Sequence, residues 1–458
     1  MKMDYRIERD SMGEMRVPKD KYWGAQTQRS LQNFNIGREK MPPEIIHAFG
    51  ILKLAAARAN AILVPGRMTD ERLSAITAAA LEVISGELDA HFPLAVWQTG
   101  SGTQTNMNVN EVIANRAAEL FPALSLHPND DINMSQSSND TFPTAMHIAA
   151  VMATEGSLLP ALSSLIKTLT RLEDENRGIV KSGRTHLQDA TPIAFSQEIS
   201  GWRASLEKDV ELIMASLTPL RSLALGATAV GTGLNSPAGF DTLVCEKISA
   251  IAKTEFCAAE NKFHALTSKD ELVFAHGALK ALACDLMKIA NDIRWLASGP
   301  RCGLSEITIP ENEPGSSIMP GKVNPTQCEA VTMVAVQVMA NDAAVSMSAS
   351  QGNFELNVFM PVCIHNYLQS VRLLSDVCRS FDENCVSGIR ANKSVMQTYL
   401  YNSLMLVTAL TPHIGYDNAA RVVHLAHKDG LSLKQACISL GYLSEAEFDE
   451  YFKPERMV

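Results

Sequence analysis

At 458 residues, the chain exceeds the size at which a single hydrophobic core keeps growing, so we expect two or three domains. The net charge of -10 at pH 7 argues against a nucleic-acid partner, because phosphate binding needs clustered lysine and arginine residues. With 46% hydrophobic and 20% charged residues, the composition is that of an ordinary globular protein.

Membrane and secretion signals are not apparent in the sequence. We find no apolar run close to the roughly 20 residues of a membrane span. The N-terminal sequence MKMDYRIERDSMGEM lacks the apolar stretch of a secretory signal. The nine cysteines are scattered, with no CxxC pair, which indicates reduced thiols rather than a disulfide framework or a zinc site. We therefore predict a cytoplasmic protein with no membrane partner and no metal.

Helical periodicity dominates the sequence, and we find no convincing strand-type alternation. Pro43 is predicted to open one helix. Thr69 is predicted to cap another, because Asp70 and Glu71 follow in its first turn. We expect residues 1–137 to form a first, mostly helical domain with short helices and loops.

Longer amphipathic helices are predicted over residues 138–354, the second domain. The clearest begins at a capping box, Ser268-Lys269-Asp270-Glu271, and ends at Gly299-Pro300. Its apolar positions alternate steps of three and four, as in a coiled coil: Leu272, Ala275, Leu279, Leu282, Leu286, Ile289, Ile293 and Leu296. Comparable stretches begin near Asn139, Phe195 and Pro325. The pattern predicts an all-α fold built around a long helical bundle.

Shorter helices return over residues 355–458, which we predict to be a small C-terminal helical domain. Its last helix begins at a second capping box, from Ser444 to Glu447.

The first of three polar patches is TGSGTQTNMNVN, residues 99–110. It carries hydroxyls, amides and two glycines but no charge, so it offers neutral donors to an anion. The alternative interpretation is a turn that caps a helix near Asn110. A further polar run follows, SQSSND at residues 135–140. The alternative to a functional role for this run is helix capping at the start of the central bundle.

The second patch is GRTHLQDA, residues 183–190. His186 lies between breaks in the helical pattern, beside a cation and several hydrogen-bonding groups. A lone histidine is more often structural than catalytic, but these neighbours favour a chemical role.

The third patch is GSSIMPGKVNP, residues 315–325. A phosphate-binding P-loop fails here, because five residues rather than four separate Gly315 from Gly321, and Val323 stands where a hydroxyl must hold magnesium. The GATAVGTG run from Gly226 also misses the dinucleotide motif GxGxxG. Neither nucleotide interpretation stands.

GSSIMPGKVNP resembles the signature of the fumarase/aspartase superfamily, whose members cleave C–N or C–O bonds to release fumarate. The other two patches resemble its other shared regions, in the same order, and the similarity covers essentially the whole chain. The resemblance implies a three-domain, all-α fold whose central bundle forms the core of a homotetramer. It also implies active sites that are each shared between three subunits.

Local features resemble the fumarase branch. TQCE follows the signature, whereas aspartases have VIPE there and alanine in place of Gly321. Aspartases also carry glutamine in place of His186, and Ser-Thr-Asn in place of Ser137-Ser138-Asn139. The resemblance implies cofactor-free, reversible hydration of fumarate to L-malate in the tricarboxylic acid cycle. The alternatives are an aspartate ammonia-lyase and a catalytically inactive, crystallin-like structural homologue.

Malate dehydration must remove a weakly acidic C3 proton by anti-elimination, so the site needs a base, donors for the aci-carboxylate intermediate and an acid for the hydroxyl. The resemblance implies Ser316 as the base, acting as an alkoxide, and Lys322 and Asn324 as donors. It implies that His186 with Glu329 handles the hydroxyl through a bound water. The other implied substrate contacts are Ser101, Thr103, Ser137, Ser138, Asn139, Thr185 and Ser317.

A segment that matches the family's accessory anion site is also present. It is His127-Pro-Asn-Asp130, in which the resemblance implies roles for His127, Asn129 and Asp130. The preceding residues, Leu124-Ser125-Leu126, lack the basic groups that relatives often carry there.

Overall fold

The computed structural model describes residues 4–458, and the contacts within it divide the chain into two compact units. Unit 1 contains the segment up to Pro160, Val210–Ala283 and Val336–Ser375; unit 2 contains Ala161–Asp209, Cys284–Ala335 and Asp376–Val458. Each unit therefore combines segments that are distant in sequence. The three predicted domains, divided after residues 137 and 354, remain a prediction.

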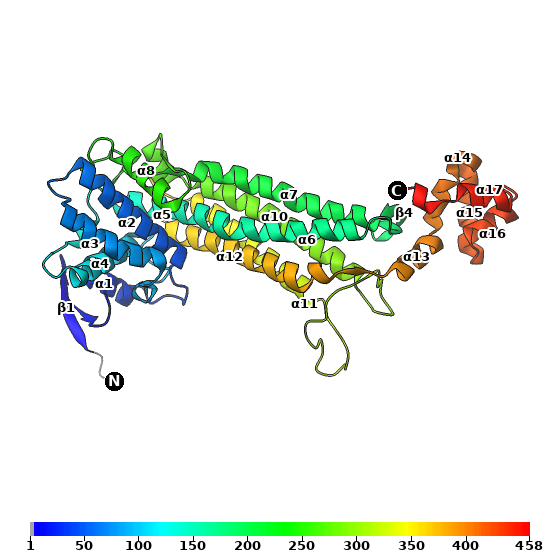
Figure 1. Ribbon diagram of the computed structural model, residues 1–458, viewed down its shortest axis with the longest axis horizontal. Helices are drawn as coiled ribbons and strands as arrows, with labels where there is room; N and C mark the ends of the chain where they lie inside the picture. Colours follow the sequence, from blue (N-terminus) through cyan, green and yellow to red (C-terminus); the bar gives the residue numbers. More distant parts are fainter. Residues whose placement is uncertain (1–3) are drawn as a thin grey trace. The chain divides into compact units, whose positions relative to one another are not determined.

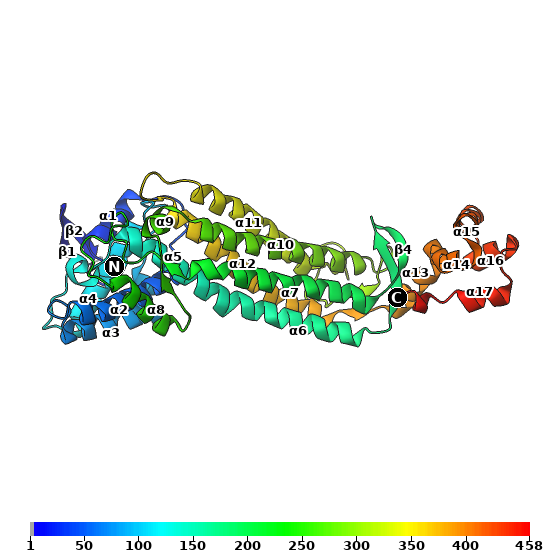
Figure 2. The same ribbon diagram turned by 90° about the horizontal axis from the view of Figure 1, so that it is seen from above.

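Helices make up most of the chain (Figure 1 and, from above, Figure 2), which confirms the predicted all-α fold. The elements of unit 1 are β1 (Tyr5–Asp10), β2 (Gly13–Pro18), α1 (Ala25–Asn33), α2 (Pro43–Leu63), α3 (Asp70–Ser85), η1 (Asp89–His91), α4 (Thr103–Leu120), η2 (Pro128–Ile132), α5 (Ser138–Ala153), η3 (Thr154–Leu158), β5 (Ser222–Leu223), α8 (Phe240–Ala252), β6 (Cys257–Ala258) and α9 (Lys262–Thr267).

Long helices contribute residues to both units: α6 (Leu159–Glu175), α7 (Phe195–Leu220), α10 (Asp270–Leu296), α11 (Thr326–Ala349) and α12 (Met360–Asn384). The remaining elements of unit 2 are β3 (Val180–Thr185), β4 (Gln188–Ala194), β7 (Ile307–Thr308), η4 (Val386–Gly388), β8 (Arg390–Ala391), α13 (Lys393–Asn402), η5 (Leu404–Ala409), α14 (Thr411–Ile414), α15 (Tyr416–Asp429), α16 (Leu433–Ser439), α17 (Glu445–Tyr451) and η6 (Pro454–Arg456).

The core of unit 1 is organised around α2, which contacts α3, α5 and α8. Phe49 of α2 packs against Phe142 of α5, with ring centroids 5.9 Å apart. Gly50 allows α3 to approach closely, because a Cβ there would lie 2.8 Å from Ile84 Cγ1. Since a fully buried aromatic or aliphatic side chain contributes about 1.5–3 kcal/mol, this packing gives the polar segments of α4 and α5 a rigid base.

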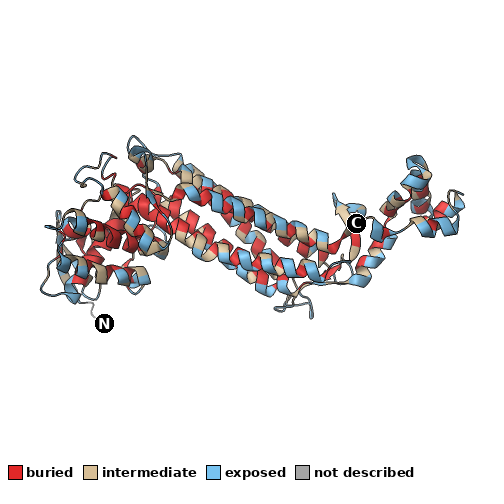
Figure 3. Cartoon of the chain, turned by 45° about the horizontal axis from the view of Figure 1, so that its top comes forward, coloured by how far each residue is buried: buried red, intermediate tan, exposed pale blue. Residues whose placement is uncertain are grey.

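Unit 2 contains a bundle of long-helix segments and a small C-terminal cluster. The buried Trp202 of α7 donates its ring N–H to Asp292 of α10 at 3.1 Å, and Ser164 of α6 donates to Asp382 of α12 at 2.7 Å. Figure 3 shows buried residues following one side of each long helix, as the sequence pattern requires. The helices α13 to α17 enclose a separate apolar cluster around Leu406.

Several predicted helix features are confirmed. All the predicted apolar positions of α10 are buried. Thr69 caps α3, Pro43 is the first residue of α2, and Ser444 forms a capping box with Glu447. The long helices α5, α7 and α11 begin within one residue of their predicted starts.

Two predictions about local structure were wrong. The chain does contain strands, as antiparallel hairpins β1–β2 and β3–β4 and short pairs β5–β6 and β7–β8. These strands are mostly half-exposed or very short, so the alternation of apolar residues is weak. At the start of α10, Ser268 donates to Asp270 at 2.7 Å rather than pairing with Glu271, which instead approaches His264 of α9.

The expectation that no apolar run approaches a membrane span was also wrong. Pro43–Leu63, Ser138–Glu175 and Thr326–Ala349 are long and apolar enough to cross a membrane, by length and composition only. All three contain many alanines, and each has an 18-residue apolar window with at most two charged residues. The chain buries 78%, 50% and 33% of the respective apolar windows. Much of the apolar surface of α11 is therefore uncovered in a single chain.

Candidate active site

The first polar patch forms a tight turn and the first turns of α4. Gly102, with φ 72°, precedes the helix, which begins at Thr103. The interpretation of a cap near Asn110 was therefore wrong, since that residue lies inside the helix. Gly100 has no space for a side chain, because a Cβ would lie 1.5 Å from a backbone oxygen. Ser101 and Thr103 hydrogen bond to each other at 2.9 Å, so two predicted contact residues lie together.

An amide network joins this patch to the second polar run. Asn106 of α4 donates to Ser138 Oγ at 2.9 Å and to Asn133 Oδ1 at 3.1 Å. Lys53 of α2 donates to Asn133 at 3.0 Å and to Gln136 at 2.9 Å. Burial lowers the pKa of Lys53 to about 7. Lys53 and Asn133 were not predicted from the sequence; the available signal was a lysine within the apolar run GILKLAAA.

The second polar run caps α5, which confirms the capping interpretation. Ser137 Oγ accepts the N–H of Asn139 at 3.2 Å, and Asp140 accepts the N–H of Ser137 at 2.9 Å. The other oxygen of Asp140 accepts the N–H of Thr228 at 2.8 Å, and burial raises the pKa of this carboxyl to about 6. The Asn139 amide donates to the carbonyl of Ala229 at 2.8 Å. The GATAVGTG run therefore holds the N-terminus of α5 in place through these hydrogen bonds. This role could not be predicted from its sequence.

His186 lies at the tip of the β3–β4 hairpin, in the non-helical stretch between α6 and α7, which confirms the predicted break in the helical pattern. Thr185 pairs with Gln188, so His186 and Leu187 form a two-residue loop with φ values of 56° and 61°. This left-handed backbone is the geometry of a type I′ turn, which asparagine and glycine normally occupy. A non-glycine residue in this conformation costs about 1–3 kcal/mol of conformational energy and persists only where the surrounding structure holds it. Such residues cluster at functional sites. Thr185 and His186 are both exposed.

A charged cavity of about 520 Å³ adjoins this hairpin. Arg184 donates to Glu306 at 2.8 and 3.2 Å, and Lys181 lies 3.0 Å from Glu198 and 3.2 Å from Glu306. The Lys181 and Glu306 side chains are almost wholly buried. The cavity is lined by Lys181, Arg184, His186, Leu187, Glu198, Lys288, Asp292, Trp295, Leu296 and Leu304. Of this network, only Arg184, the cation beside His186 in the GRTHLQDA patch, could be singled out from the sequence.

The loop before α11 places backbone donors around one hydroxyl. Ser316 Oγ accepts the N–H of Ile318 at 3.2 Å and the N–H of Met319 at 3.0 Å. Two N–H groups aimed at one oxygen stabilise negative charge on it. Ser317, the next residue, is exposed.

The same loop is closed by a short internal network. Lys322 Nζ donates to Asn324 Oδ1 at 2.7 Å, and Asn324 Nδ2 donates to the carbonyl of Gly315 at 2.7 Å. Gly315 also donates its N–H to the carbonyl of Lys322 at 2.8 Å, and a Cβ on Gly315 would lie 2.5 Å from that oxygen. Since an ammonium group has three N–H donors, Lys322 keeps two for an anion.

Glu329 lies in the first turn of α11 and is exposed. Among residues 4–458, no hydrogen bond or ion pair joins Glu329 to His186 within one chain. The predicted His186–Glu329 pair therefore stays a prediction.

The segment that matches the accessory anion site surrounds η2. His127 Nδ1 accepts the N–H of Asp130 at 3.2 Å and lies 3.3 Å from its carboxylate. The Asn129 amide donates to Met107 Sδ at 3.6 Å, and all three predicted residues are exposed. Arg67 reaches this turn by donating to the Asp130 carbonyl at 3.4 Å. Asp130 places negative charge on this surface, so the geometry gives no direct support for anion binding.

Potential metal ligands lie elsewhere. The nine cysteines are free. His264, Asp270 and Glu271 bring ligand atoms within 4.8 Å of one another, a cluster that motif spacing did not reveal. Burial and the neighbouring Asp270 raise the pKa of Glu271 to about 7, whereas the pKa of Asp270 is lowered to about 2, which favours a protonated Glu271 beside an ionised Asp270.

Comparison with known proteins identifies the family. The Lyase model matches residues 13–340, and the model of the fumarase C C-terminus matches residues 406–458. The class II fumarate hydratase of Bacillus subtilis is 60% identical and that of Helicobacter pylori 58% identical, each over 100% of this chain and 99% of the relative. The chain belongs to the class II fumarate hydratases. The predicted membership of this branch of the superfamily is thus confirmed.

Solved structures agree with this membership of the class II fumarate hydratases. The crystal structure of a class II fumarase from Schistosoma mansoni matches with a TM-score of 0.96 and 45% identity, over 99% of both chains. A fumarate lyase:delta crystallin structure from Brucella melitensis, bound to cobalt, matches with a TM-score of 0.94 and 38% identity, again over 99% of both chains. The fold of the chain is therefore that of the family from end to end.

Proposed function

We propose that the protein catalyses the reversible hydration of fumarate to L-malate, with Ser316 as the base. The observation that carries the proposal is the pair of N–H groups, from Ile318 and Met319, that Ser316 Oγ accepts. These donors stabilise the alkoxide form, which takes the proton from C3 of malate and becomes a neutral hydroxyl. Membership of the class II fumarate hydratases supports the choice of reaction.

The electron pair left at C3 moves into the adjacent carboxylate and forms an aci-carboxylate. Lys322 and Asn324 are the donors that we assign to it. Lys322 gives one N–H to Asn324 and keeps two, and Asn324 gives one N–H to the Gly315 carbonyl and keeps one. The C2–O bond then breaks on the opposite face, and the leaving hydroxide takes a proton from a water that His186 and Glu329 orient. The hydroxide left from that water is neutralised, through solvent, by the proton that Ser316 took from C3, which restores the alkoxide. The net products are fumarate and one water.

The second substrate carboxylate is assigned to the hydroxyl and amide groups of unit 1. Thr103 and Ser138 begin α4 and α5, where backbone N–H groups lack intrahelical partners and the helix dipole favours an anion. Ser101 and Asn139 hold these helix starts in place through their hydrogen bonds. The remaining residues that we assign to substrate binding are Ser137, Thr185 and Ser317.

We infer that the working form is a homotetramer in which three subunits build each site. The exposed side of α11 supports this: Met333, Val336 and Met347 are 67%, 59% and 70% exposed in the single chain. Met333 and Val336 are three residues apart, and Val336 and Met347 are eleven apart, which is a sum of steps of three and four, so the three side chains share one face of the helix. Light scattering should give a mass near four times 49.8 kDa. A fully active monomer would exclude shared sites.

The proposal also includes the division into three domains, a cytoplasmic location without membrane or nucleic-acid partners, and a role for His127, Asn129 and Asp130 as an accessory anion site. For the accessory site, the support is the family resemblance alone.

The function is tested by following fumarate absorbance when purified protein, treated with EDTA, is mixed with L-malate. We expect full turnover, because each proposed step uses a side chain or backbone group of the chain. Loss of activity with EDTA and its return with a divalent metal would overturn the cofactor-free mechanism.

A further inference from the structure

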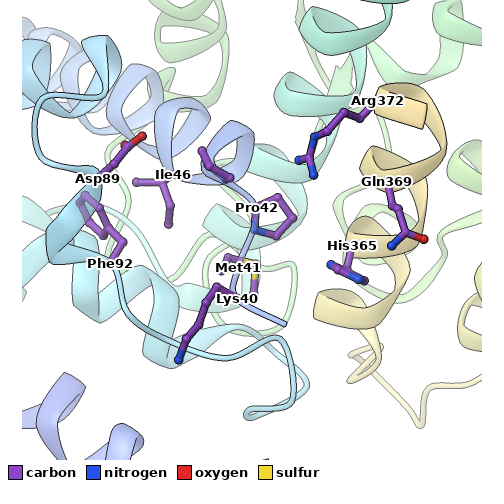
Figure 4. Close-up of a pocket in the computed structure, with 10 residues that line it drawn as sticks. Lys40, Met41, Pro42, Ile46, Asp89, Phe92, His365, Gln369 and Arg372 are labelled. Carbon is purple, nitrogen blue, oxygen red and sulfur yellow. The ribbon is translucent and has the colours of Figure 1, made fainter. Parts of the chain in front are cut away.

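A cavity in unit 1, separate from every proposed active-site residue, has a built polar wall. Its volume is about 320 Å³. Figure 4 shows residues of α12 facing the loop before α2 and the segment around η1. The lining residues are Lys40, Met41, Pro42, Pro43, Ile46, Asp89, Phe92, His365, Gln369 and Arg372. Small-molecule sites usually have about this volume at least, with apolar walls and a few converging polar groups.

The polar wall comes from α12. His365, Gln369 and Arg372 are spaced four and three residues apart, so they share one face of the helix. His365 Nδ1 is buried and has no hydrogen-bond partner among residues 4–458. An unpaired buried polar atom is costly, so it points to a missing partner.

The neighbours of His365 also keep free donors. Arg372 uses one nitrogen, Nη2, for both oxygens of Glu44, at 2.8 and 3.0 Å, so its other guanidinium N–H groups remain available. The Gln369 amide oxygen accepts from Asn341 at 3.0 Å, which leaves its NH₂ group for another acceptor. Lys40 has no ion-pair partner within the described chain and adds positive charge to the rim.

The opposite side of the cavity is apolar and then acidic. Met41, Ile46 and Phe92 are buried and present hydrocarbon. Asp89 lies beyond them, on the side away from α12 (Figure 4), and pairs with His47 at 3.0 Å. A ligand with one carboxylate and a short apolar body fits this order of groups, whereas Asp89 would repel a second carboxylate at the far end.

We propose that this cavity binds a small monocarboxylate, with the carboxylate on His365, Gln369 and Arg372 and the alkyl chain on Met41 and Phe92. The Arg372 guanidinium suits a carboxylate because its N–H groups match the two oxygens. The site differs from the proposed active site by selecting against dicarboxylates. It does not depend on the proposed reaction.

Saturation-transfer NMR with butyrate on the purified, assembled protein tests the proposal. We expect saturation of the butyrate alkyl protons, with an affinity around the millimolar range for a ligand this small. Excess fumarate should not displace it. Arg372→Gln and His365→Phe should weaken binding at least about tenfold, and His365→Gln, which keeps a donor, should weaken it less.

Arg171→Gln is the matched control, because Arg171 is also an exposed, ion-paired arginine, 3.3 Å from Glu175. It should bind butyrate as the wild type does. Circular dichroism melts verify that each variant is folded. If no saturation of the butyrate protons is seen at about 50 mM butyrate, the proposal is overturned. That result would follow if another subunit filled the cavity. Displacement of butyrate by fumarate also overturns the proposal. So does an equal affinity for butyrate in Arg372→Gln and in His365→Gln.

Discussion

Replacing Ser316 with alanine removes the proposed base and leaves the N–H groups of Ile318 and Met319 without their acceptor. General base catalysis contributes about 10²–10⁴ in rate. We therefore expect kcat to fall about 10³-fold, which corresponds to roughly 4 kcal/mol of barrier. The loss should appear in kcat rather than in KM, because the base acts on the transition state.

Stability should change little in Ser316→Ala. The loop is largely exposed, so water can replace the lost acceptor, and the expected change in unfolding free energy is below about 1 kcal/mol. The assay is fumarate absorbance at saturating malate, with a thermal melt of the same sample. Ser317→Ala is the neighbouring comparison, and we expect less than about a tenfold loss of kcat. If Ser316→Ala retains more than about a tenth of wild-type kcat, less than 1.4 kcal/mol of barrier, the base lies elsewhere.

Three further changes test the assembly, the packing and the buried charges. Ser316→Ala and His186→Asn, each nearly inactive, should partly restore activity when refolded together, because mixed tetramers contain sites with one intact copy of each residue; no recovery contradicts shared sites. Gly100→Ala should lower Tm strongly, since its methyl would lie 1.5 Å from a carbonyl oxygen, whereas Gly66→Ala, with open space, should not; equal melts would refute the packing argument. Burial and Asp285 raise the pKa of Asp209 from 3.8 to about 7, so wild-type stability falls as pH rises through that window. Asp209→Asn should therefore raise Tm at pH 8 more than at pH 4, and an equal effect at both pH values would contradict the buried charge.

Features set by short-range periodicity could be predicted from the sequence. The buried seam of α10 and the cap formed by Ser444 and Glu447 depend only on neighbours a few residues away. The capping box at Ser268 was wrong because a residue of the preceding helix, His264, approaches Glu271. Such competition depends on tertiary contacts that spacing does not show.

The candidate site shows the same limit. The resemblance singled out Ser316 and Lys322, but the N–H groups of Ile318 and Met319 are visible only in the folded loop. His186 has the residue type for proton transfer, yet its place in a hairpin was missed because His-Leu is an unusual pair for that turn. Lys53 was missed because a buried lysine is rare and its partners come from a distant loop.

The most direct test of the proposed function offers the protein both nucleophiles at once. Fumarate is incubated with the enzyme in ammonium buffer, and malate and aspartate are quantified by proton NMR. A site that orients water through polar groups discriminates against a mispaired ligand by about 10⁴ or more. We predict malate as the product, with aspartate lower by at least about that factor. Aspartate as the main product would contradict the proposed reaction and the roles given to His186 and Glu329.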